Sequence, residues 1–448
     1  MNYKRVKTVV TIGPACDSYQ MLKKLILEGA DAFRFNLSHG NKDYFRKVVA
    51  DVRKAEEETK RRVLIFFDLP GPKFRTGKVH GDKLEIKDGT EYTFGKNGQI
   101  QVSEDILKMI NLKNKLLLSD GKLEFKPIKK EMGLLIARAL NGGILLNEQS
   151  INFKGISYPG KYPTQKDIDG IKFGLSLGIH TFALSFVSNS KDVENARRIA
   201  GEESTLIAKI ERLEAVKHFE EIARAADIIM VARGDLGLNL DIADLPEVQK
   251  KLIFICNQYS RPVITATQML ESMTNNVMPT RAEADDVFTA IEEGTDAVML
   301  SEETAIGVYP LKALKMLQHI ISKYNYSKVP PNKYRIITER DAIVNAAVDL
   351  STKAKINKMI VVTPHGKSAL NIARYHLPVD IIGITDKPYI LARLIFSRGV
   401  IPILFEDLKN IEEKVKQIAK QYKIKKAILI SGLSASENAS ESIRIVKF

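Results

Sequence analysis

The sequence predicts an α/β protein built on an eight-stranded (β/α)₈ barrel, the TIM barrel, with a small inserted β domain and a C-terminal open α/β domain. Three observations support this fold. Short apolar runs recur along the chain, helical patterns separate them, and polar residues gather directly after them. Eight parallel strands alternating with helices close into such a barrel, and its active sites are built at the carboxyl ends of the strands.

The N-terminal part of the chain contains three of the eight strands. A helix is expected over Asp17–Glu28, where Gly29 suits the left-handed position that ends many helices, and a second, charged helix over Asp43–Lys60. The strands are expected at Val6–Ile12, Ala32–Phe35 and Val63–Phe67.

The alternation of strand and helix stops after the third strand. From Lys73 to about Ile151 the sequence reads as short alternating segments with turn signals, which predicts a small β domain inserted into the barrel. Pro70-Gly71-Pro72 and Gly142-Gly143 are candidate hinges for this domain. The alternative is a long insertion that does not move relative to the barrel. Its clearest strands are expected at Lys83–Lys87, Glu91–Phe94 and Leu116–Leu118.

The alternation then resumes and completes the barrel. A helix follows the last strand at Leu311–Lys323, and Ser327–Asn332, which contains Pro330-Pro331, reads as a linker. The five remaining strands are expected at Phe182–Ser185, Leu206–Lys209, Ile228–Val231, Val263–Thr267 and Ala297–Leu300.

A third region follows the linker and predicts an open α/β domain, because helical patterns separate the first four of its five strands. The expected domains are a barrel at 1–71 and 152–326, an inserted domain at 72–151 and a C-terminal domain at 333–448. The C-terminal strands are expected at Met359–Val362, Ile381–Thr385, Ile401–Phe405, Ala427–Ser431 and Ile443–Val446.

Composition narrows the class of protein. The chain has 448 residues, and no window approaches the ~18 consecutive apolar residues of a membrane span. Cys16 and Cys256 are its only cysteines and no export signal is visible, which predicts a cytoplasmic protein. The net charge of +14 fits, in decreasing order, a lysine-rich surface, steering of anionic substrates and nucleic-acid binding, because the lysines are scattered and no nucleic-acid motif is present.

The candidate site begins with the apolar run Ile228–Ala232, which breaks at Arg233-Gly234-Asp235. Gly234 lacks a Cβ, so a ligand can approach its backbone, and the N–H groups of Gly234 and Asp235 could serve an anion. Lys209 and Glu211 are two residues apart and therefore on the same side of an extended chain. Carboxylate oxygens suit Mg²⁺, so these residues predict a site for a phosphorylated acid held through a metal. An ordinary salt bridge at the ends of two strands explains them equally well.

Barrel closure favours the functional interpretation, because it brings together polar residues that are distant in sequence. After the predicted strands come Asn36, Ser38, Asp68, Glu211, Thr267, Gln268, Ser301, Glu302, Glu303 and Thr304.

The first C-terminal strand runs into a second candidate site. It is followed by a glycine turn and a helix, an arrangement that can bind an anion at the helix N-terminus. A capped helix with exposed polar residues is an equal alternative. The residues are Thr363, His365, Gly366, Lys367 and Ser368.

Eight segments, in order along nearly the whole chain, resemble the pyruvate kinase family. They are KTVVTIGPAC (Lys7–Cys16), FRFNLSHG (Phe33–Gly40), DLPGPKFRTG (Asp68–Gly77), AKIERLEAV (Ala208–Val216), IIMVARGDLG (Ile228–Gly237), PVITATQMLESM (Pro262–Met273), PTRAEADDV (Pro279–Val287) and AVMLSEETAIGVYP (Ala297–Pro310). The resemblance implies the architecture derived above, and transfer of a phosphoryl group from phosphoenolpyruvate to ADP, giving pyruvate and ATP in glycolysis.

The resemblance also implies roles for individual residues. Glu211 and Asp235 would bind Mg²⁺, and a second Mg²⁺ would arrive with the nucleotide. Lys209 would neutralise charge on the transferring phosphoryl group and the enolate, and Arg34 would hold the phosphate. Electrostatic positioning of this kind dominates phosphoryl transfer.

The resemblance implies further residues that would bind the substrate carboxylate, protonate the enolate and contact the nucleotide. The N–H groups of Gly234 and Asp235, with Thr267, would receive the substrate carboxylate. Thr267 and Ser301 would lie near the proton donor to the enolate, with Thr267 as a relay, because a hydroxyl of normal pKa is a poor direct acid. The nucleotide contacts would be His39 and Arg75.

The family's monovalent-cation site corresponds to Asn36, Ser38, Asp68 and the backbone carbonyl of Leu69. Leu69-Pro70 replaces the usual Thr-Lys pair, and Lys73 stands where many members carry Glu. The ammonium of Lys73 could supply the charge of the missing ion, so we expect K⁺ to be dispensable. Glu302 replaces a usual Gly beside Ser301, which puts the expected geometry of Ser301 in doubt.

The resemblance further implies a homotetramer, allosteric regulation, and a phosphorylated effector at the Thr363–Ser368 loop, with no nucleic-acid or membrane partner. Two other functions are compatible with these residues. A barrel lyase or aldolase with a Mg²⁺-bound pyruvate enolate would need no nucleotide, and a basic nucleic-acid-binding protein would show steeply salt-dependent binding without turnover.

Overall fold

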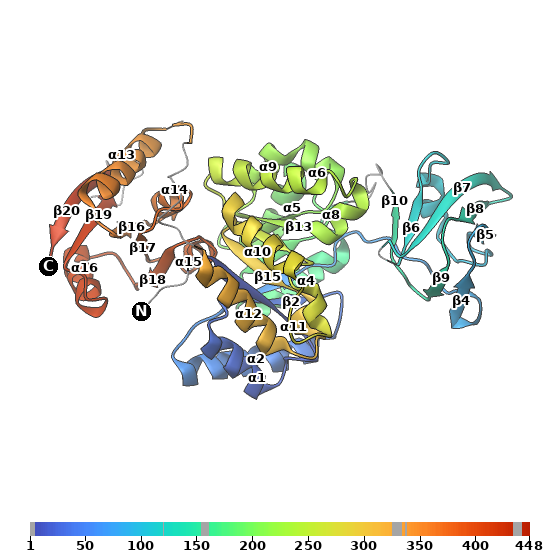
Figure 1. Ribbon diagram of the computed structural model, residues 1–448, viewed down its shortest axis with the longest axis horizontal. Helices are drawn as coiled ribbons and strands as arrows, with labels where there is room; N and C mark the ends of the chain where they lie inside the picture. Colours follow the sequence, from blue (N-terminus) through green and yellow to red (C-terminus); the bar gives the residue numbers. More distant parts are fainter. Residues whose placement is uncertain (1–4, 120, 154–160, 325–333, 337, 433–440) are drawn as a thin grey trace.

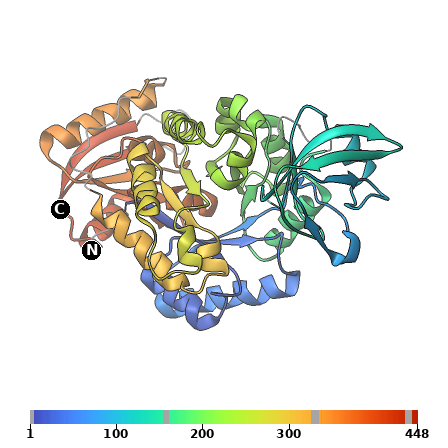
Figure 2. The ribbon, with the colours of Figure 1, turned by 45° about the vertical axis from the view of Figure 1, so that its right-hand side comes forward.

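The computed structural model describes residues 5–119, 121–153, 161–324, 334–336, 338–432 and 441–448. The molecule is elongated, with the barrel between two smaller parts (Figure 1). The inserted β strands lie at one end of the molecule and the C-terminal sheet at the other, and the turned view in Figure 2 shows the same arrangement. The linker expected at Ser327–Asn332 lies outside the described residues.

The predicted barrel is confirmed. Its eight strands form one closed sheet in the order β1-β15-β14-β13-β12-β11-β3-β2, and every neighbouring pair is parallel. The strands are β1 (Lys7–Ile12), β2 (Ala32–Asn36), β3 (Leu64–Asp68), β11 (Thr181–Leu184), β12 (Thr205–Ile210), β13 (Ile228–Ala232), β14 (Val263–Ala266) and β15 (Ala297–Leu300).

Helices surround the barrel sheet and their ends follow the local sequence. In the first helix the Ser18 hydroxyl accepts the Met21 N–H, and Gly29 at φ 97° ends the helix as expected. The helices are α1 (Tyr19–Glu28), α2 (Lys42–Thr59), α4 (Gln165–Ser176), α5 (Ser190–Ala200), α6 (Leu213–Lys217), α7 (Phe219–Ala225), α8 (Arg233–Asn239), α9 (Leu245–Gln258), α10 (Arg281–Glu293), α11 (Glu302–Ala305) and α12 (Pro310–Lys323), with a 3₁₀ turn, η2, at Glu271–Thr274.

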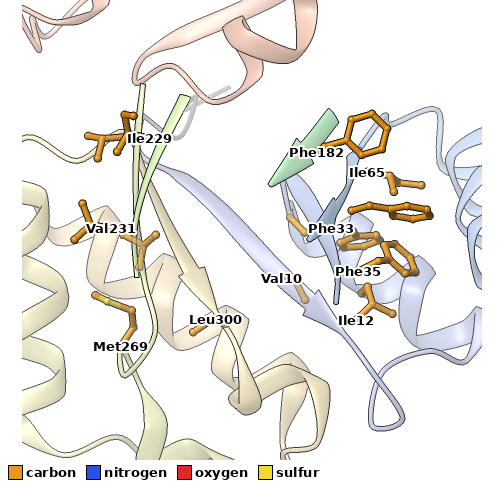
Figure 3. Packing of buried hydrophobic residues seen from close by; sticks show 14 of the residues in the cluster. Val10, Ile12, Phe33, Phe35, Ile65, Phe182, Ile229, Val231, Met269 and Leu300 are labelled. Carbon is orange, nitrogen blue, oxygen red and sulfur yellow. The ribbon is translucent and has the colours of Figure 1, made fainter. Parts of the chain in front are cut away.

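Two apolar layers follow from the alternation of side chains along each strand. Residues facing outward pack against the helices, and Figure 3 shows the rings of Phe33, Phe35 and Phe182 gathered beside Ile65 in this layer. Residues facing inward, such as Val9, form a separate buried cluster inside the barrel. The interior is therefore a packed core.

The inserted part is a β domain, as expected, although larger than the segments recognised in the sequence. One sheet has the order β10-β6-β7-β8-β5, and β4 pairs with β9 separately. Its elements are η1 (His80–Asp82), β4 (Lys83–Ile86), β5 (Glu91–Phe94), α3 (Glu104–Met109), β6 (Leu116–Leu118), β7 (Leu123–Glu131), β8 (Leu134–Ala139), β9 (Gly143–Leu146) and β10 (Ile151–Phe153).

One of the two candidate hinges of this domain is wrong. Gly143 is the first residue of β9 and pairs with Ile86 of β4, so Gly142-Gly143 is a turn inside the domain. The other, Pro70-Gly71-Pro72, is closely held, because the Gly71 N–H donates to Asp167 Oδ1 at 2.8 Å and a Cβ on Gly71 would lie 2.7 Å from the carbonyl oxygen of Ser185.

The C-terminal region is the predicted open α/β unit. Its sheet has the order β18-β17-β16-β19-β20, parallel except for the antiparallel β20. Its elements are α13 (Glu339–Ala354), β16 (Lys358–Val362), α14 (Lys367–Ala373), β17 (Asp380–Thr385), α15 (Pro388–Ile395), β18 (Val400–Leu404), α16 (Ile411–Gln421), β19 (Lys426–Gly432) and β20 (Glu441–Lys447).

This C-terminal unit closes the amino-terminal end of the barrel, which we call the floor. Phe396, directly after α15, is fully buried in the cluster of barrel-interior residues, and its ring centroid lies 5.9 Å from that of Phe66 on β3. The buried Lys7 donates from Nζ to the carbonyl of Val400 at 2.7 Å. The buried ring of Phe396 therefore belongs to the C-terminal unit, and the residues that surround it belong to the barrel.

Ion pairs and hydrogen bonds at the floor reinforce this attachment. The Arg398 N–H donates to Asp296 Oδ1 at 2.8 Å, and Arg393 Nη2 lies 2.9 Å from Asp227 Oδ1. Burial raises the pKa of Asp296 to about 6.

No helix among the described residues is both long and apolar enough to cross a membrane. The two cysteines are buried, and burial raises the pKa of the Cys16 thiol to about 12.

We expect Phe396→Ala to lower the free energy of unfolding by about 3–5 kcal/mol, because it removes a buried ring and leaves a cavity at the floor. Phe448→Ala, at an exposed position, should cost about 0.5 kcal/mol or less. Urea unfolding followed by circular dichroism measures both, and equal midpoints for the two variants would refute the role assigned to Phe396.

Candidate functional site

The carboxyl ends of the barrel strands, which we call the mouth, collect the polar side chains that face inward. The same alternation that places Val9 and Phe66 inside the barrel places Thr11, Arg34 and Asp68 there, one step further along their strands. The residues Arg34, Asp68, Ser185, Lys209 and Glu211 form a connected set, which we call the strand-end cluster.

Asp68 is the centre of this cluster. Its Oδ2 accepts Arg34 Nε at 2.6 Å, and its Oδ1 accepts Lys209 Nζ at 3.1 Å and Ser185 Oγ at 3.2 Å. Burial alone would raise the pKa of the Asp68 carboxyl, but the charges of Lys209 and Arg34 outweigh burial and lower it. Asp68 is therefore an anion that holds two cations in fixed positions.

Lys209 lies between carboxylates. Its Nζ donates to Ser185 Oγ at 2.7 Å and lies 2.9 Å from Glu211 Oε1, which confirms that Lys209 and Glu211 project to the same side. Burial would lower the pKa of the Lys209 ammonium, but Asp68 and Glu211 outweigh it and raise the pKa. The ammonium stays charged in a site of low dielectric, where a charge acts strongly.

The two carboxylate oxygens of Glu211 have different surroundings. Its Oε2 accepts the Phe186 N–H at 2.6 Å, while its buried Oε1 has no hydrogen bond of good geometry from the described residues and only the ion pair with Lys209. Burial raises the pKa of Glu211, Lys209 opposes this, and the charge of Asp235 raises it further. Two carboxylates that repel each other in this way are typical of a metal site.

These observations fit a divalent cation. Glu211 and Asp235 would hold it through oxygen, the ligand type that Mg²⁺ prefers. The described residues contain no group of three or more His, Cys, Asp and Glu arranged for a metal, so the protein would supply these two carboxylates and leave other positions to ligands. Without the ion, Arg34, Asp68, Lys209, Glu211 and Asp235 carry one more negative than positive charge, and a divalent cation would reverse that sign.

The turn after β14 departs from the expected strand. The strand ends at Ala266, and Thr267 at φ 68° and Gln268 at φ 54° both adopt the left-handed region, which is unusual for a β-branched residue. The Thr267 hydroxyl accepts the Gly234 N–H at 2.8 Å and donates to the Ala266 carbonyl at 2.5 Å. The Gly234 N–H, expected to serve an anion, is therefore bonded to Thr267.

Gly234 and Asp235 lie in the first turn of α8, where backbone N–H groups have no carbonyl partner inside the helix. A Cβ at Gly234 would lie 3.4 Å from the Thr267 hydroxyl, which is an ordinary van der Waals contact.

Ser301 lies at the corresponding place after β15. Its backbone N–H donates to Glu303 Oε2 at 2.6 Å, and its buried hydroxyl has no hydrogen-bond partner among the described residues. Glu302, which replaces a usual glycine, is an exposed residue at the start of α11.

The residues expected around a monovalent cation are only partly brought together. Asn36 ends β2 beside Asp68, and its side-chain oxygen accepts the Ser38 N–H at 3.1 Å. Leu69 is buried and its N–H donates to the Ala183 carbonyl. Lys73 is half-buried, and its N–H donates to the Gly71 carbonyl at 3.0 Å.

The two expected nucleotide contacts lie further out. His39 is exposed on the loop after β2, and the exposed Arg75 donates to the Glu148 carbonyl at 2.9 Å on the chain returning from the inserted domain. Among the described residues, neither His39 nor Arg75 forms a hydrogen bond or ion pair with the strand-end cluster.

The C-terminal candidate loop has a positive-φ glycine, Gly366, at φ 76°. Thr363 and Ser368 are buried, whereas His365 and Lys367 are exposed. The following helix α14 has seven residues.

Sequence reasoning missed Ser185, Thr11 and Arg233 as site residues. Period-two alternation from Ala183 and Val9 would have placed Ser185 and Thr11 at the mouth. Arg233 was visible in the motif, but its contacts with the turn after β14 depend on two left-handed residues that no local pattern predicts.

Comparison with known proteins gives a consistent result. The family model described as pyruvate kinase, barrel domain, matches residues 3–314, and the model described as pyruvate kinase, alpha/beta domain, matches residues 341–441. Pyruvate kinases of Agrobacterium vitis and Thermotoga maritima are each 34% identical, over 100% and 99% of this chain and 97% and 99% of their own sequences. A crystal structure of a pyruvate kinase from Cryptosporidium parvum superposes with a TM-score of 0.89 at 29% identity, covering 99% of this chain and 96% of that one.

The raised pKa of Glu211 predicts that Mg²⁺ binding weakens as pH falls, because the proton competes with the metal for a carboxyl whose pKa lies above its usual value of 4.5. Asp235→Asn should lower the affinity and move the remaining pH dependence to lower pH, since the repelling charge is gone. Isothermal titration of Mg²⁺ without substrates, from about pH 5 to about pH 8, measures this.

Glu203→Gln, at an exposed position, is the matched control and should leave the profile unchanged. A wild-type affinity that stays constant across this range, or the same affinity and profile in Asp235→Asn, would contradict the assignment.

Proposed function

The chain belongs to the pyruvate kinase family of phosphotransferases, and we propose that its catalytic site is the strand-end cluster with Asp235, Thr267 and Ser301. The observation that supports this best is the Asp68 carboxylate holding Arg34 and Lys209 beside Glu211. The comparisons support neither a barrel lyase or aldolase nor a nucleic-acid-binding protein, because the relatives are pyruvate kinases.

In the proposed reaction, the bond between phosphorus and the enol oxygen of phosphoenolpyruvate breaks while a bond forms to a terminal β-phosphate oxygen of ADP. ATP leaves, and the enolate takes a proton at carbon to give pyruvate. Charge moves from the transferring group to the enolate oxygen, so fixed positive charges are what the protein must supply.

Lys209 and Arg34 provide these charges. Asp68 holds both side chains and Ser185 holds the ammonium, so little reorganisation is required when the substrate binds. Arg34 offers planar N–H donors suited to a phosphate, and Lys209 a point charge suited to a group in motion.

Glu211 and Asp235 are the proposed ligands of Mg²⁺. When bound, this ion would stabilise negative charge on the substrate oxygens. We further propose that a second Mg²⁺ accompanies the nucleotide, and that His39 and Arg75 contact the nucleotide. In this proposal the mouth of the barrel holds the acid and the side nearer the inserted domain holds ADP.

The proton for the enolate would arrive through the hydroxyls of Thr267 and Ser301. The Thr267 hydroxyl bonds to the Gly234 N–H, and the Ser301 hydroxyl is buried with no protein partner among the described residues. A hydroxyl that both accepts and donates can pass a proton between water and carbon without becoming an ion. The Gly234 and Asp235 N–H groups and Thr267 would receive the substrate carboxylate, and the Gly234 N–H would then be shared between Thr267 Oγ1 and the substrate.

Lys73 motivates a proposal about K⁺. Asn36, Ser38, Asp68 and the Leu69 carbonyl would form the cation site, yet Lys73 adds a positive charge to the loop that leaves β3. At ~4 Å and an effective dielectric near ~20, a unit charge is worth roughly 4 kcal/mol, which is large enough to replace a bound ion.

The remaining proposals concern assembly and regulation. The domains would be 1–71 with 152–326, 72–151 and 333–448, the enzyme a homotetramer in the cytoplasm, and the Thr363–Ser368 loop an effector site for a phosphorylated compound. The exposed Lys367 and the turn at Gly366 support the last of these.

The direct test of the function is formation of pyruvate and ATP from phosphoenolpyruvate and ADP, with and without Mg²⁺. Turnover that requires both ADP and Mg²⁺ is expected. Pyruvate released without ADP would indicate a lyase instead.

Lys209→Met should lower kcat by about 10³-fold or more while phosphoenolpyruvate binding stays within a few-fold, since the ammonium acts mainly in the transition state. Steady-state rates and titration of phosphoenolpyruvate in the presence of Mg²⁺ measure the two quantities. Lys166→Met, at an exposed position on α4, is the control. Near-normal kcat in Lys209→Met would remove this residue from the mechanism.

Activity should be independent of K⁺ in the wild type, because the Lys73 ammonium supplies the missing charge. Initial rates in a buffer whose only monovalent cation is a bulky ammonium, with and without KCl at constant ionic strength, measure this. Lys73→Glu should be poorly active without K⁺ and be rescued by it. A stimulation of wild type by K⁺ of more than about tenfold, or ~1.4 kcal/mol on the barrier, would overturn the proposal.

A further inference from the structure

The turn after β14 is held in an unfavourable conformation. Thr267 and Gln268 are consecutive residues with side chains, and both have positive φ, at 68° and 54°. Such a conformation persists only where the surroundings stabilise it. The proposed role of Thr267 depends on this turn, because in this arrangement of the chain the Thr267 hydroxyl accepts the Gly234 N–H.

The guanidinium of Arg233 binds this turn directly. Its Nη2 donates to the carbonyls of Thr267 at 2.7 Å and Gln268 at 3.0 Å, and lies 2.8 Å from the sulfur of Met269. Its Nε donates to the Thr267 carbonyl at 3.2 Å. Arg233 is only 6% exposed and directly precedes Gly234, so one residue joins both backbone segments that face the site.

On the opposite side Glu303 joins the same turn to the strand next to it. Its buried carboxylate accepts the Leu270 N–H at 3.1 Å and the Ser301 N–H at 2.6 Å. The turn is therefore held at both ends, by a guanidinium on its carbonyls and by a carboxylate on an N–H.

Arg233 is oriented in turn by a carboxylate on α10. Its Nη1 donates to both oxygens of Asp286, at 2.7 Å and 2.6 Å, and lies 3.5 Å from Gln249 Oε1. The Asp286 side chain is 36% exposed. A continuous series of contacts thus runs from a partly exposed carboxylate, through Arg233, to the Thr267 carbonyl and the hydroxyl of the same residue.

We propose that Asp286 and Arg233 are positioning residues for the reaction. The Asp286 carboxylate fixes the plane of the guanidinium, and the guanidinium keeps Thr267 and Gln268 in the left-handed region, so that the Thr267 hydroxyl stays beside Gly234. This inference rests on the proposed function and deepens it. Small displacements of a reacting group have large effects on the rate, so an ion pair that does not touch the substrate can still affect kcat.

An ion pair that serves stability alone would make a different prediction. Its loss would lower the thermal midpoint while leaving kcat unchanged at temperatures where the protein stays folded. A positioning role requires kcat to fall in protein that is folded, with the substrate affinities little changed.

The variants are Asp286→Ala, Asp286→Asn and Asp286→Glu, with Asp285→Asn as the matched control at an exposed carboxylate next to it on α10. We expect kcat to fall about tenfold or more in Asp286→Ala, less in Asp286→Asn, and to recover in Asp286→Glu. KM for ADP should stay within about twofold, and Asp285→Asn should match wild type.

A second readout isolates the proton-transfer end of the site. Under the proposed function, exchange of the methyl protons of pyruvate with deuterium oxide, in the presence of Mg²⁺ and inorganic phosphate, would pass through the Thr267 hydroxyl and would need no ADP. This exchange should slow in Asp286→Ala in parallel with kcat, and circular dichroism at the assay temperature shows that the variant is folded.

The possible outcomes distinguish failure of the proposed function from failure of the positioning role. Wild-type protein that forms no pyruvate from phosphoenolpyruvate and ADP overturns the proposed function. Active wild type with Asp286→Ala at the kcat and exchange rate of Asp285→Asn overturns the positioning role, whether or not the thermal midpoint falls. A lower kcat that Asp286→Glu restores supports it.

Discussion

The buried carboxylate of Asp68 is the interaction on which the site depends. Two cations, Arg34 and Lys209, project into the barrel from different strands, and each would be costly to bury without a partner. Asp68 compensates both, and its lowered pKa keeps it ionised. The positive charges are consequently in place before any anion arrives, which is the condition for electrostatic catalysis.

Much of this could be predicted from the sequence, because it depends on local regularities. Period-two alternation and eight strands are sufficient to bring Arg34, Asp68, Lys209 and Glu211 to one mouth. The turn at Thr267 could not be predicted, since its left-handed residues are imposed by contacts from Arg233, 34 residues away in sequence. Most strands of the inserted sheet were missed for a related reason: β7 and β8 are partly exposed, and their pairing is set by partners elsewhere in the domain.

The two additional units attach to opposite ends of the barrel and by different means. The inserted domain leaves through Pro70-Gly71-Pro72, where Arg212, the neighbour of Glu211, donates to the Pro72 carbonyl at 3.1 Å. The C-terminal unit is attached through the buried ring of Phe396 and the pairs made by Arg393 and Arg398. The first attachment is a few polar contacts beside the cluster, and the second is a part of the barrel core.

The buried ring of Phe396 determines at which end of the barrel small molecules can enter and leave. Phe396 is buried in the same cluster as the residues that fill the barrel interior, so the described residues form a packed core and not a pore. In the proposed function, substrate and product would therefore both enter and leave at the mouth, beside the point where the inserted domain leaves the barrel.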